Sequence, residues 1–270
     1  MYIISNAMLV VLIIDILVSL SIPVLLYLAL RRRFGCHRRP FFFGAATFLL
    51  FAMVLEQLVH LVVLRSSVGV VIQQNVWLFA LYGGAMAGLF EESGRLIVFS
   101  TLLKRRMDKD HDALMFGAGH GGMEVILVFT ATMVMNLYYA LMIRSGRAEA
   151  LLASMGEQQG AMVGAIFTSL STTAAPIYLL GLLERFAAVV LHLSFSTLVW
   201  VAVKEKDRRS LFWLAVLLHF AVDAVAVLMS RSGISLLLLE AVVIILAAIC
   251  AFIAWRVWRS RSIEAVPETA

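Results

Sequence analysis

Charged residues are scarce in this 270-residue chain. Asp, Glu, Lys and Arg together make up 14% of it, and hydrophobic residues make up 62%. A soluble globular domain has about 25% charged and about 45–50% apolar residues. The composition therefore excludes an ordinary soluble domain and predicts an integral membrane protein.

Proline and cysteine are also rare. The chain has four prolines and two cysteines, no linker rich in Ser and Gly, and no internal repeat. We therefore expect one transmembrane domain over residues 1–270. Cys36 lies in a basic loop and Cys250 in the last apolar run, where no disulfide is expected. The first apolar run lacks a basic n-region and is too long for a signal peptide, so it is predicted to be a retained span.

Seven apolar runs are long enough to cross a hydrocarbon core, which needs about 20 residues. They cover residues 3–30, 41–64, 76–103, 113–143, 176–203, 210–230 and 234–257. The expected fold class is therefore an all-α integral membrane protein, a polytopic bundle of about seven transmembrane helices.

The basic residues lie in alternate connections between these runs. Residues 31–39, 104–112, 204–209 and 256–262 hold 16 of the 22 Lys and Arg residues. The positive-inside rule then predicts an N-terminus outside and a C-terminus in the cytoplasm of a cell membrane, which we expect to be a bacterial plasma membrane. The basic residues are therefore expected to lie at the surface of the lipid bilayer. The net charge of +5 then does not indicate a nucleic-acid partner.

One long connection, residues 144–175, falls on the predicted outer side. Its first part has the pattern of a short amphipathic helix, and its second part is too short to span comfortably. The sequence leaves open a lid, an interfacial segment and a plain connector.

Three charged residues interrupt the third apolar run. In GLFEESGRLIVF, residues 88–99, Glu91, Glu92 and Arg95 stand among apolar side chains. Each charge at the centre of a membrane helix costs about 2.5–3.5 kcal/mol, so the three together require partners, water or a function. Later runs supply the candidate partners His120, Glu124, His192, His219 and Asp223.

The spacing of these residues predicts that they face the interior of a bundle. Residues i and i+4 share one face of an α-helix. The pairs with this spacing are Glu91 with Arg95, His120 with Glu124, and His219 with Asp223. At 1.5 Å per residue, Glu91 and the three histidines lie about 10–18 Å from the basic ends of their runs, in one layer of the membrane.

Such a cluster has the chemistry for hydrolysis of an amide bond. Two adjacent carboxylates beside an arginine can provide a general base near neutral pH. Imidazoles opposite them can orient water, bind a metal or stabilise an oxyanion.

The motifs resemble those of a known superfamily. EESGR (91–95) resembles the EExxR/EExxxR motif of the CAAX prenyl endopeptidase and bacteriocin-processing superfamily of intramembrane proteases. Residues 116–120 fit its FxxxH motif, and residues 219–223 fit its HxxxN/D motif. The fuller pattern, GAGHGGMEVIL (117–127) with ER (184–185), HLSFS (192–196) and HFAVD (219–223), is more similar to the YhfC branch, and PrsW-type proteases are more distant.

The resemblance implies an intramembrane endopeptidase that cuts a membrane-embedded or membrane-associated peptide. It assigns Glu91 as the general base, with His120 sharing the water, and His219 with Asp223 as metal or oxyanion ligands. The residues with supporting roles are Glu92, Arg95, Glu124, Glu184 and Arg185.

Two departures from the superfamily pattern leave questions open. Arg95 follows the glutamate pair after two residues, so Glu91 and Glu92 both remain candidates for the base. A further histidine, His192, completes a set with His120 and His219 that could hold zinc. There is no HExxH motif, which excludes a zincin site. Glutamic chemistry without a cofactor is preferred, with zinc as the alternative.

A proton-coupled transporter or channel is the rival function, because buried charged residues also mark proton pathways. The lack of an internal repeat favours the enzyme. A catalytically inactive binding scaffold is a third possibility. Glu56 and His60 lie about 23–28 Å from the basic end of their run, and we expect them to be structural partners of Glu184 and Arg185.

Overall fold

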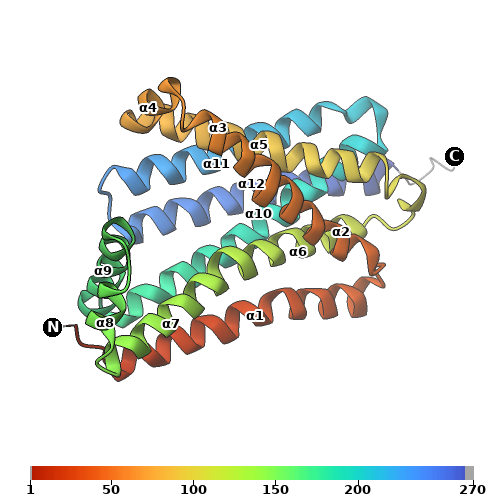
Figure 1. Ribbon diagram of the computed structural model, residues 1–270. Coiled ribbons are helices and arrows are strands. Elements are labelled where there is room, and N and C mark those ends of the chain that lie inside the picture. The colour runs from red at the N-terminus through yellow and green to blue at the C-terminus, as the bar shows by residue number, and fades with distance from the viewer. Residues whose placement is uncertain (1, 265–270) are drawn as a thin grey trace, which may run out of the picture. The chain divides into compact units, whose positions relative to one another are not determined.

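A computed structural model describes residues 2–264, with side chains for all of these except 106 and 261–264. Its α-helices are α1 (Asn6–Phe34), α2 (Arg39–Thr47), α3 (Gln57–Val63), α4 (Ser67–Gln74), α5 (Val76–Ser100), α6 (Asp112–Glu124), α7 (Ala131–Arg144), α8 (Ala148–Ala153), α9 (Glu157–Thr172), α10 (Tyr178–Lys204), α11 (Ser210–Arg231) and α12 (Leu236–Glu264) (Figure 1). Two π-helical stretches, Phe48–Glu56 and Val125–Thr130, join α2 to α3 and α6 to α7. Residues 2–264 contain no strand, so the predicted all-α class is confirmed.

Hydropathy identifies the membrane-spanning helices. Within the described residues, six helices are long and apolar enough to cross a membrane: Asn6–Phe34, Arg39–Val63, Asp112–Arg144, Ala175–Lys204, Lys206–Arg231 and Leu236–Ser260. Each coincides with a run predicted from the sequence. The remaining run predicted from the sequence corresponds to α5, a helix of 25 residues. Its charged residues Glu91, Glu92 and Arg95 lower its hydropathy. The protein is thus a multi-pass membrane protein, and a seventh span and the orientation stay predictions.

The helices fall into two compact units. One contains Met1–Ile22 and Val125–Arg185, and the other contains Pro23–Glu124 and Phe186–Ala270. The single domain expected from the sequence stays a prediction. All the cluster residues on α5, α6, α10 and α11 belong to the second unit, from Glu91 to Asp223.

In the first unit, the long connection forms two helices. The predicted amphipathic part becomes α8, and the following part becomes α9, which packs against α7. Phe167 of α9 is fully buried, with ring centroids 5.6 Å from Tyr139 and 5.3 Å from Tyr2. Ser19 of α1 and Thr130 share a buried hydrogen bond of 2.8 Å. The connection is therefore a packed helical segment.

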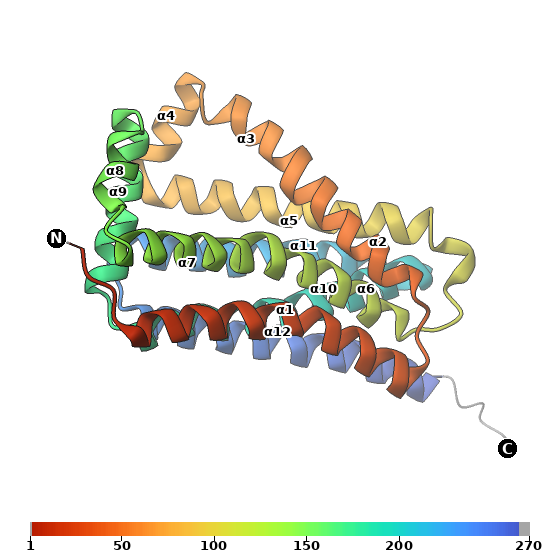
Figure 2. The same cartoon turned by 60° about the horizontal axis from the view of Figure 1, so that its bottom comes forward.

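In the second unit, glycines bring pairs of helices into close contact. α5 lies antiparallel beside α11, and α2 packs on α6 (Figure 2). A Cβ atom at Gly84 would lie 2.5 Å from the Phe220 carbonyl oxygen, and one at Gly119 would lie 1.9 Å from that of Phe41. These backbones approach closely because no side chain separates them, as is common where helices pack in membranes.

Gly119→Ala should destabilise the protein, because its new methyl group would overlap the backbone of α2. Overpacking of this kind costs about 1–3 kcal/mol. The measurement is the thermal unfolding midpoint of the purified protein in detergent. Gly160→Ala in α9 is the control, since its nearest neighbour would be 3.6 Å away, and we expect an unchanged or higher midpoint. Equal midpoints for the two variants would contradict the close contact of α2 with α6.

Cys36 lies in the connection between α1 and α2. It is buried, although a position in a loop suggests exposure. Its thiol donates a hydrogen bond to the His111 carbonyl oxygen at 3.4 Å, and Arg31 donates to the Cys36 carbonyl at 2.5 Å. Burial raises the pKa of the Cys36 thiol to about 11.

Cys36 should therefore react very slowly with maleimide in the folded protein. A pKa about two units above normal lowers the thiolate fraction about 100-fold below pH 9, and burial slows the reaction further. Labelling followed by mass spectrometry measures the rate. A cysteine at exposed Ser210, in a Cys36→Ser background, should react at the rate of a free thiol. Equal rates at the two positions would show that Cys36 is accessible.

Candidate active site

The helix α5 carries the central charged residues of the cluster. It begins after Asn75, whose side-chain oxygen accepts hydrogen bonds from the backbone N–H groups of Trp77 and Leu78 at 3.0 and 3.1 Å. This is a typical N-cap. Gly84, Gly88 and Glu92 follow at intervals of four residues and share one face. Because the two glycines let α11 approach, Glu92 reaches a side chain of that helix.

Glu92 is an acceptor shared by two helices. Its Oε1 accepts hydrogen bonds from Arg95 Nη1 at 2.5 Å and from His219 Nδ1, on α11, at 2.7 Å. The side chain of Glu92 has no exposed surface. Glu92 therefore holds α5 and α11 together.

Arg95 links the same carboxylate to α10. It donates from Nη2 to His192 Nδ1 at 2.7 Å and from Nε to Ser196 Oγ at 3.3 Å. A guanidinium can only donate, so His192 Nδ1 must accept. The His192 proton is therefore on Nε2, which donates to the carboxylate of Glu124.

Glu91 pairs with His120 of α6. His120 Nε2 donates to Glu91 Oε2 at 2.8 Å, and the same oxygen lies 3.5 Å from Arg95 Nη2 and 3.8 Å from His192 Nδ1. His120 is fully buried against the ring of Phe48, 5.3 Å away. Among the described residues, no group hydrogen-bonds to His120 Nδ1.

Exposure differs between the carboxylates of the cluster, since Glu92 has no exposed surface and the other three have some. Exposure of the side chain rises from 9% at Glu91 to 16% at Glu124 and 36% at Asp223. Asp223 Oδ2 lies 3.6 Å from His219 Nε2. The ring of His219 stacks on that of Phe195, with centroids 4.9 Å apart. Glu124 and Asp223 are thus the most exposed members of the cluster and form its exposed edge.

The cluster carries an excess of negative charge. Glu91, Glu92, Glu124 and Asp223 supply four carboxylates against the single guanidinium of Arg95. Three uncompensated negative charges are strongly unfavourable within a membrane. Protons held by the cluster, or a bound cation, must offset most of this charge.

One set of ligand atoms is suitable for a metal ion. Side-chain atoms of Glu91, His120 and His192 lie within 4.8 Å of one another, and all three residues are buried. This set differs from the three histidines expected from the sequence, because His219 is held by Glu92 and Glu91 takes its place. Two imidazoles and a carboxylate form a familiar ligand set for catalytic zinc, and a carboxylate partner such as Glu124 on the second nitrogen is typical of a ligating histidine. The donor set therefore fits a divalent metal, provided that Arg95 releases His192 Nδ1.

The other predicted residues have the following positions. Glu184 and Arg185 form an ion pair at 2.5 Å in the first unit, so their supporting role and their pairing with Glu56 and His60 stay predictions. A Cβ atom at Gly117 would lie 2.8 Å from the His192 carbonyl oxygen, so this glycine serves close helix packing. Sequence reasoning missed Ser196, although its spacing of four residues from His192 in HLSFS indicates a shared face.

Glu56 lies nearer to the cluster than we predicted from its depth in the membrane, which was counted along the sequence. It is buried, accepts from His60 Nε2 at 3.2 Å, and interacts electrostatically with Glu91, His219 and Asp223. His60 Nδ1 also contacts the Tyr82 hydroxyl at 2.8 Å. Counting 1.5 Å per residue overestimates depth along a tilted helix, and α2 and α3 run obliquely to α5 (Figure 2).

The fold and the cluster together define a class: a multi-pass membrane protein with carboxylates, imidazoles and a guanidinium buried among its helices. The chain belongs to the family described as YhfC intramembrane metalloprotease, whose model matches residues 18–244. This confirms the resemblance seen in the motifs. The chain is also 37% identical over 217 residues to the "Uncharacterized membrane protein YhfC" of Bacillus subtilis (strain 168), covering 79% of this chain and 82% of that protein. No solved structure matches the chain.

Glu92→Gln should destabilise the protein, because its Oε1 accepts from both a guanidinium and an imidazole. Hydrogen bonds to charged groups contribute about 1.5–3 kcal/mol, so we expect a clearly lower unfolding midpoint in detergent. Asp223→Asn is the matched control, since this carboxylate is partly exposed and makes only a 3.6 Å contact. If both variants unfold at the wild-type midpoint, Glu92 does not hold the helices together.

Proposed function

We propose that this protein is an intramembrane endopeptidase that hydrolyses a peptide bond in a membrane-embedded or membrane-associated substrate. The observation that supports this most strongly is the pairing of Glu91 with His120 beside Arg95, within helices of a membrane protein. Membership of a family described as intramembrane metalloproteases supports the same reaction class.

Glu91 is the better candidate than Glu92 for direct chemistry. Glu92 has no exposed surface, and its Oε1 is held by two partners. Glu91 has 9% of its side chain exposed, against none for Glu92, and contacts one imidazole closely. We assign Glu92 and Arg95 to holding the helices in place, and Glu91 to the reacting water.

His219 and Asp223 are suited to the substrate carbonyl. With Nδ1 donating to Glu92, His219 has its Nε2 directed to the side of Asp223. A protonated Nε2 there would donate to the oxyanion that forms when water attacks the carbonyl carbon. Asp223 would keep the proton on that nitrogen and, at the exposed edge, accept from the substrate amide.

We also propose that Glu91, His120 and His192 hold a divalent metal, zinc being the best match to their donor atoms. Bound there, it would supply a Lewis acid and a more acidic water. The excess negative charge of the cluster, the Glu124 carboxylate on His192 and the family description support this assignment over the cofactor-free chemistry preferred from the sequence. In this arrangement Glu91 is a ligand, and Asp223 is left to take and return the proton.

Glu91→Gln should reduce cleavage by at least about 100-fold, because the neutral amide neither accepts a proton nor binds a metal well. The measurement compares new N-termini in membrane proteins of cells that express wild type or variant. Glu149→Gln, at an exposed position of α8, is the control and should be as active as wild type. The Glu91→Gln protein should still be inserted and show a cooperative unfolding transition in detergent.

Wild-type cleavage by Glu91→Gln would reject its role in the reaction. A transporter would behave differently: proteoliposomes would show Glu91-dependent proton flux, and no new N-terminus would appear.

The metal assignment predicts one zinc ion per wild-type chain, measured on purified protein by elemental analysis. His192→Ala should lose this zinc, as should His120→Ala, because each removes one of three ligands. His219→Ala is the matched control and should retain zinc, since Glu92 holds this imidazole. Loss of zinc in His219→Ala would favour the three-histidine set. Chelator-resistant cleavage by metal-free wild type would make Glu91 the base of a glutamic protease.

A further inference from the structure

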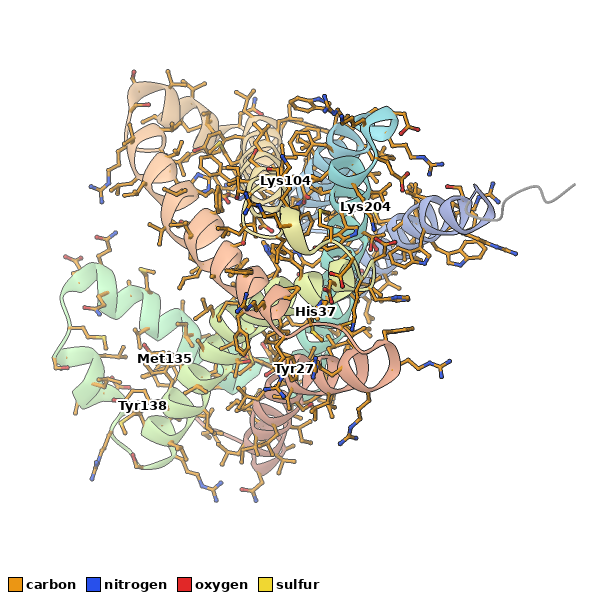
Figure 3. All side chains as sticks on the ribbon, turned by 90° about the vertical axis from the view of Figure 1, so that its right-hand side faces the viewer. Tyr27, His37, Lys104, Met135, Tyr138 and Lys204 are labelled. Carbon is orange, nitrogen blue, oxygen red and sulfur yellow. The ribbon has the colours of Figure 1, made fainter. Side chains whose placement is uncertain are left out.

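A pocket of about 820 Å³ lies at the basic ends of α5, α10 and α11 in the second unit. Figure 3 views these helix ends and labels Lys104 and Lys204, which both line the pocket. The pocket includes the junction between the spans Ala175–Lys204 and Lys206–Arg231, so it lies at a membrane boundary.

The rim of the pocket is strongly basic. Lys104, Arg105, Lys206 and Arg209 are exposed, and none of them forms an ion pair with another described residue. The fifth cation, Lys204, is paired with Asp110 at 2.6 Å. The described residues that line the pocket include no carboxylate. The rim therefore has a positive charge that lacks a counterion within this part of the chain.

The floor of the pocket is apolar. Leu96, Val203 and Phe212 line it, and Trp213 stands at its edge with 64% of its surface exposed. Binding of a small soluble anion would require only the cations of the rim and not the apolar floor. A tryptophan at the edge of a basic rim is instead typical of the interface between lipid headgroups and acyl chains.

We propose that this pocket binds an anionic glycerophospholipid, with the phosphodiester among the four unpaired cations and the first part of an acyl chain against the apolar floor. Basic pockets between helix ends bind anionic headgroups by this combination of contacts. Leu96 follows Arg95 directly, and Phe212 lies two turns before His219 on α11. A bound lipid would therefore stabilise the ends of helices that carry the polar cluster.

The test is a titration of the purified full-length protein with dioleoyl phosphatidylglycerol in neutral detergent, read by the unfolding midpoint. Dioleoyl phosphatidylcholine, with the same chains, is the neutral probe. We expect phosphatidylglycerol to raise the midpoint and phosphatidylcholine to leave it unchanged. Lys104→Gln/Arg105→Gln/Arg209→Gln should weaken the apparent affinity about 100-fold, since each cation contributes roughly fivefold near an anionic lipid.

The matched control removes three exposed arginines outside the pocket, Arg32→Gln/Arg33→Gln/Arg256→Gln, and should bind phosphatidylglycerol as wild type does. If the pocket triple does not fold, Arg209→Gln alone should weaken binding several-fold. Equal weakening in the control would overturn the proposal in favour of general surface charge. A midpoint shift of the same size with inorganic phosphate or an acidic peptide would also overturn it, because neither needs the apolar floor.

Discussion

The guanidinium of Arg95 is the group on which the arrangement of the cluster depends. It has no exposed surface, so each of its N–H groups needs an acceptor within the protein. Glu92, His192 and Ser196 provide these acceptors, and Glu91 lies 3.5 Å away. Because these residues come from α5 and α10, and Glu92 continues the contact to His219, a single buried cation fixes three helices relative to one another.

Close packing allows this cation to be surrounded. In a bilayer, apolar helices gain little by leaving lipid for each other, and association depends on van der Waals contact and polar contacts. Gly84 and Gly88 let α5 touch α11, and Gly117 lets α6 touch α10. The glycines and the charged residues therefore act together: the first bring the backbones near, and the second determine which residues meet.

The helices were predictable because hydropathy and charge alone mark their ends. The predicted run 113–143 corresponds to the helix Asp112–Arg144, and 176–203 to Ala175–Lys204. The meeting of His120 with Glu91 was also predictable, since buried charges must find partners. The atoms that meet were not predictable. Helix rotation determines that one oxygen of Glu92 accepts from two partners, and that Glu91, rather than His219, lies beside His120 and His192. Sequence spacing fixes a face of one helix but not its angle against its neighbours.

The π-helical stretch Val125–Thr130 has a consequence for how the chain can vary. Its i→i+5 turns hold one residue more than α-helical turns, so it changes the rotational phase between α6 and α7. The phase change begins directly after Glu124, at the boundary between the two compact units. After this boundary, Val125, Phe129, Thr130 and Met133 are all buried, and all four belong to the first unit. Loss of a single residue in this stretch would restore α-helical phase and turn Val125 about the helix axis relative to Met133, so the stretch has a required length as well as required side chains.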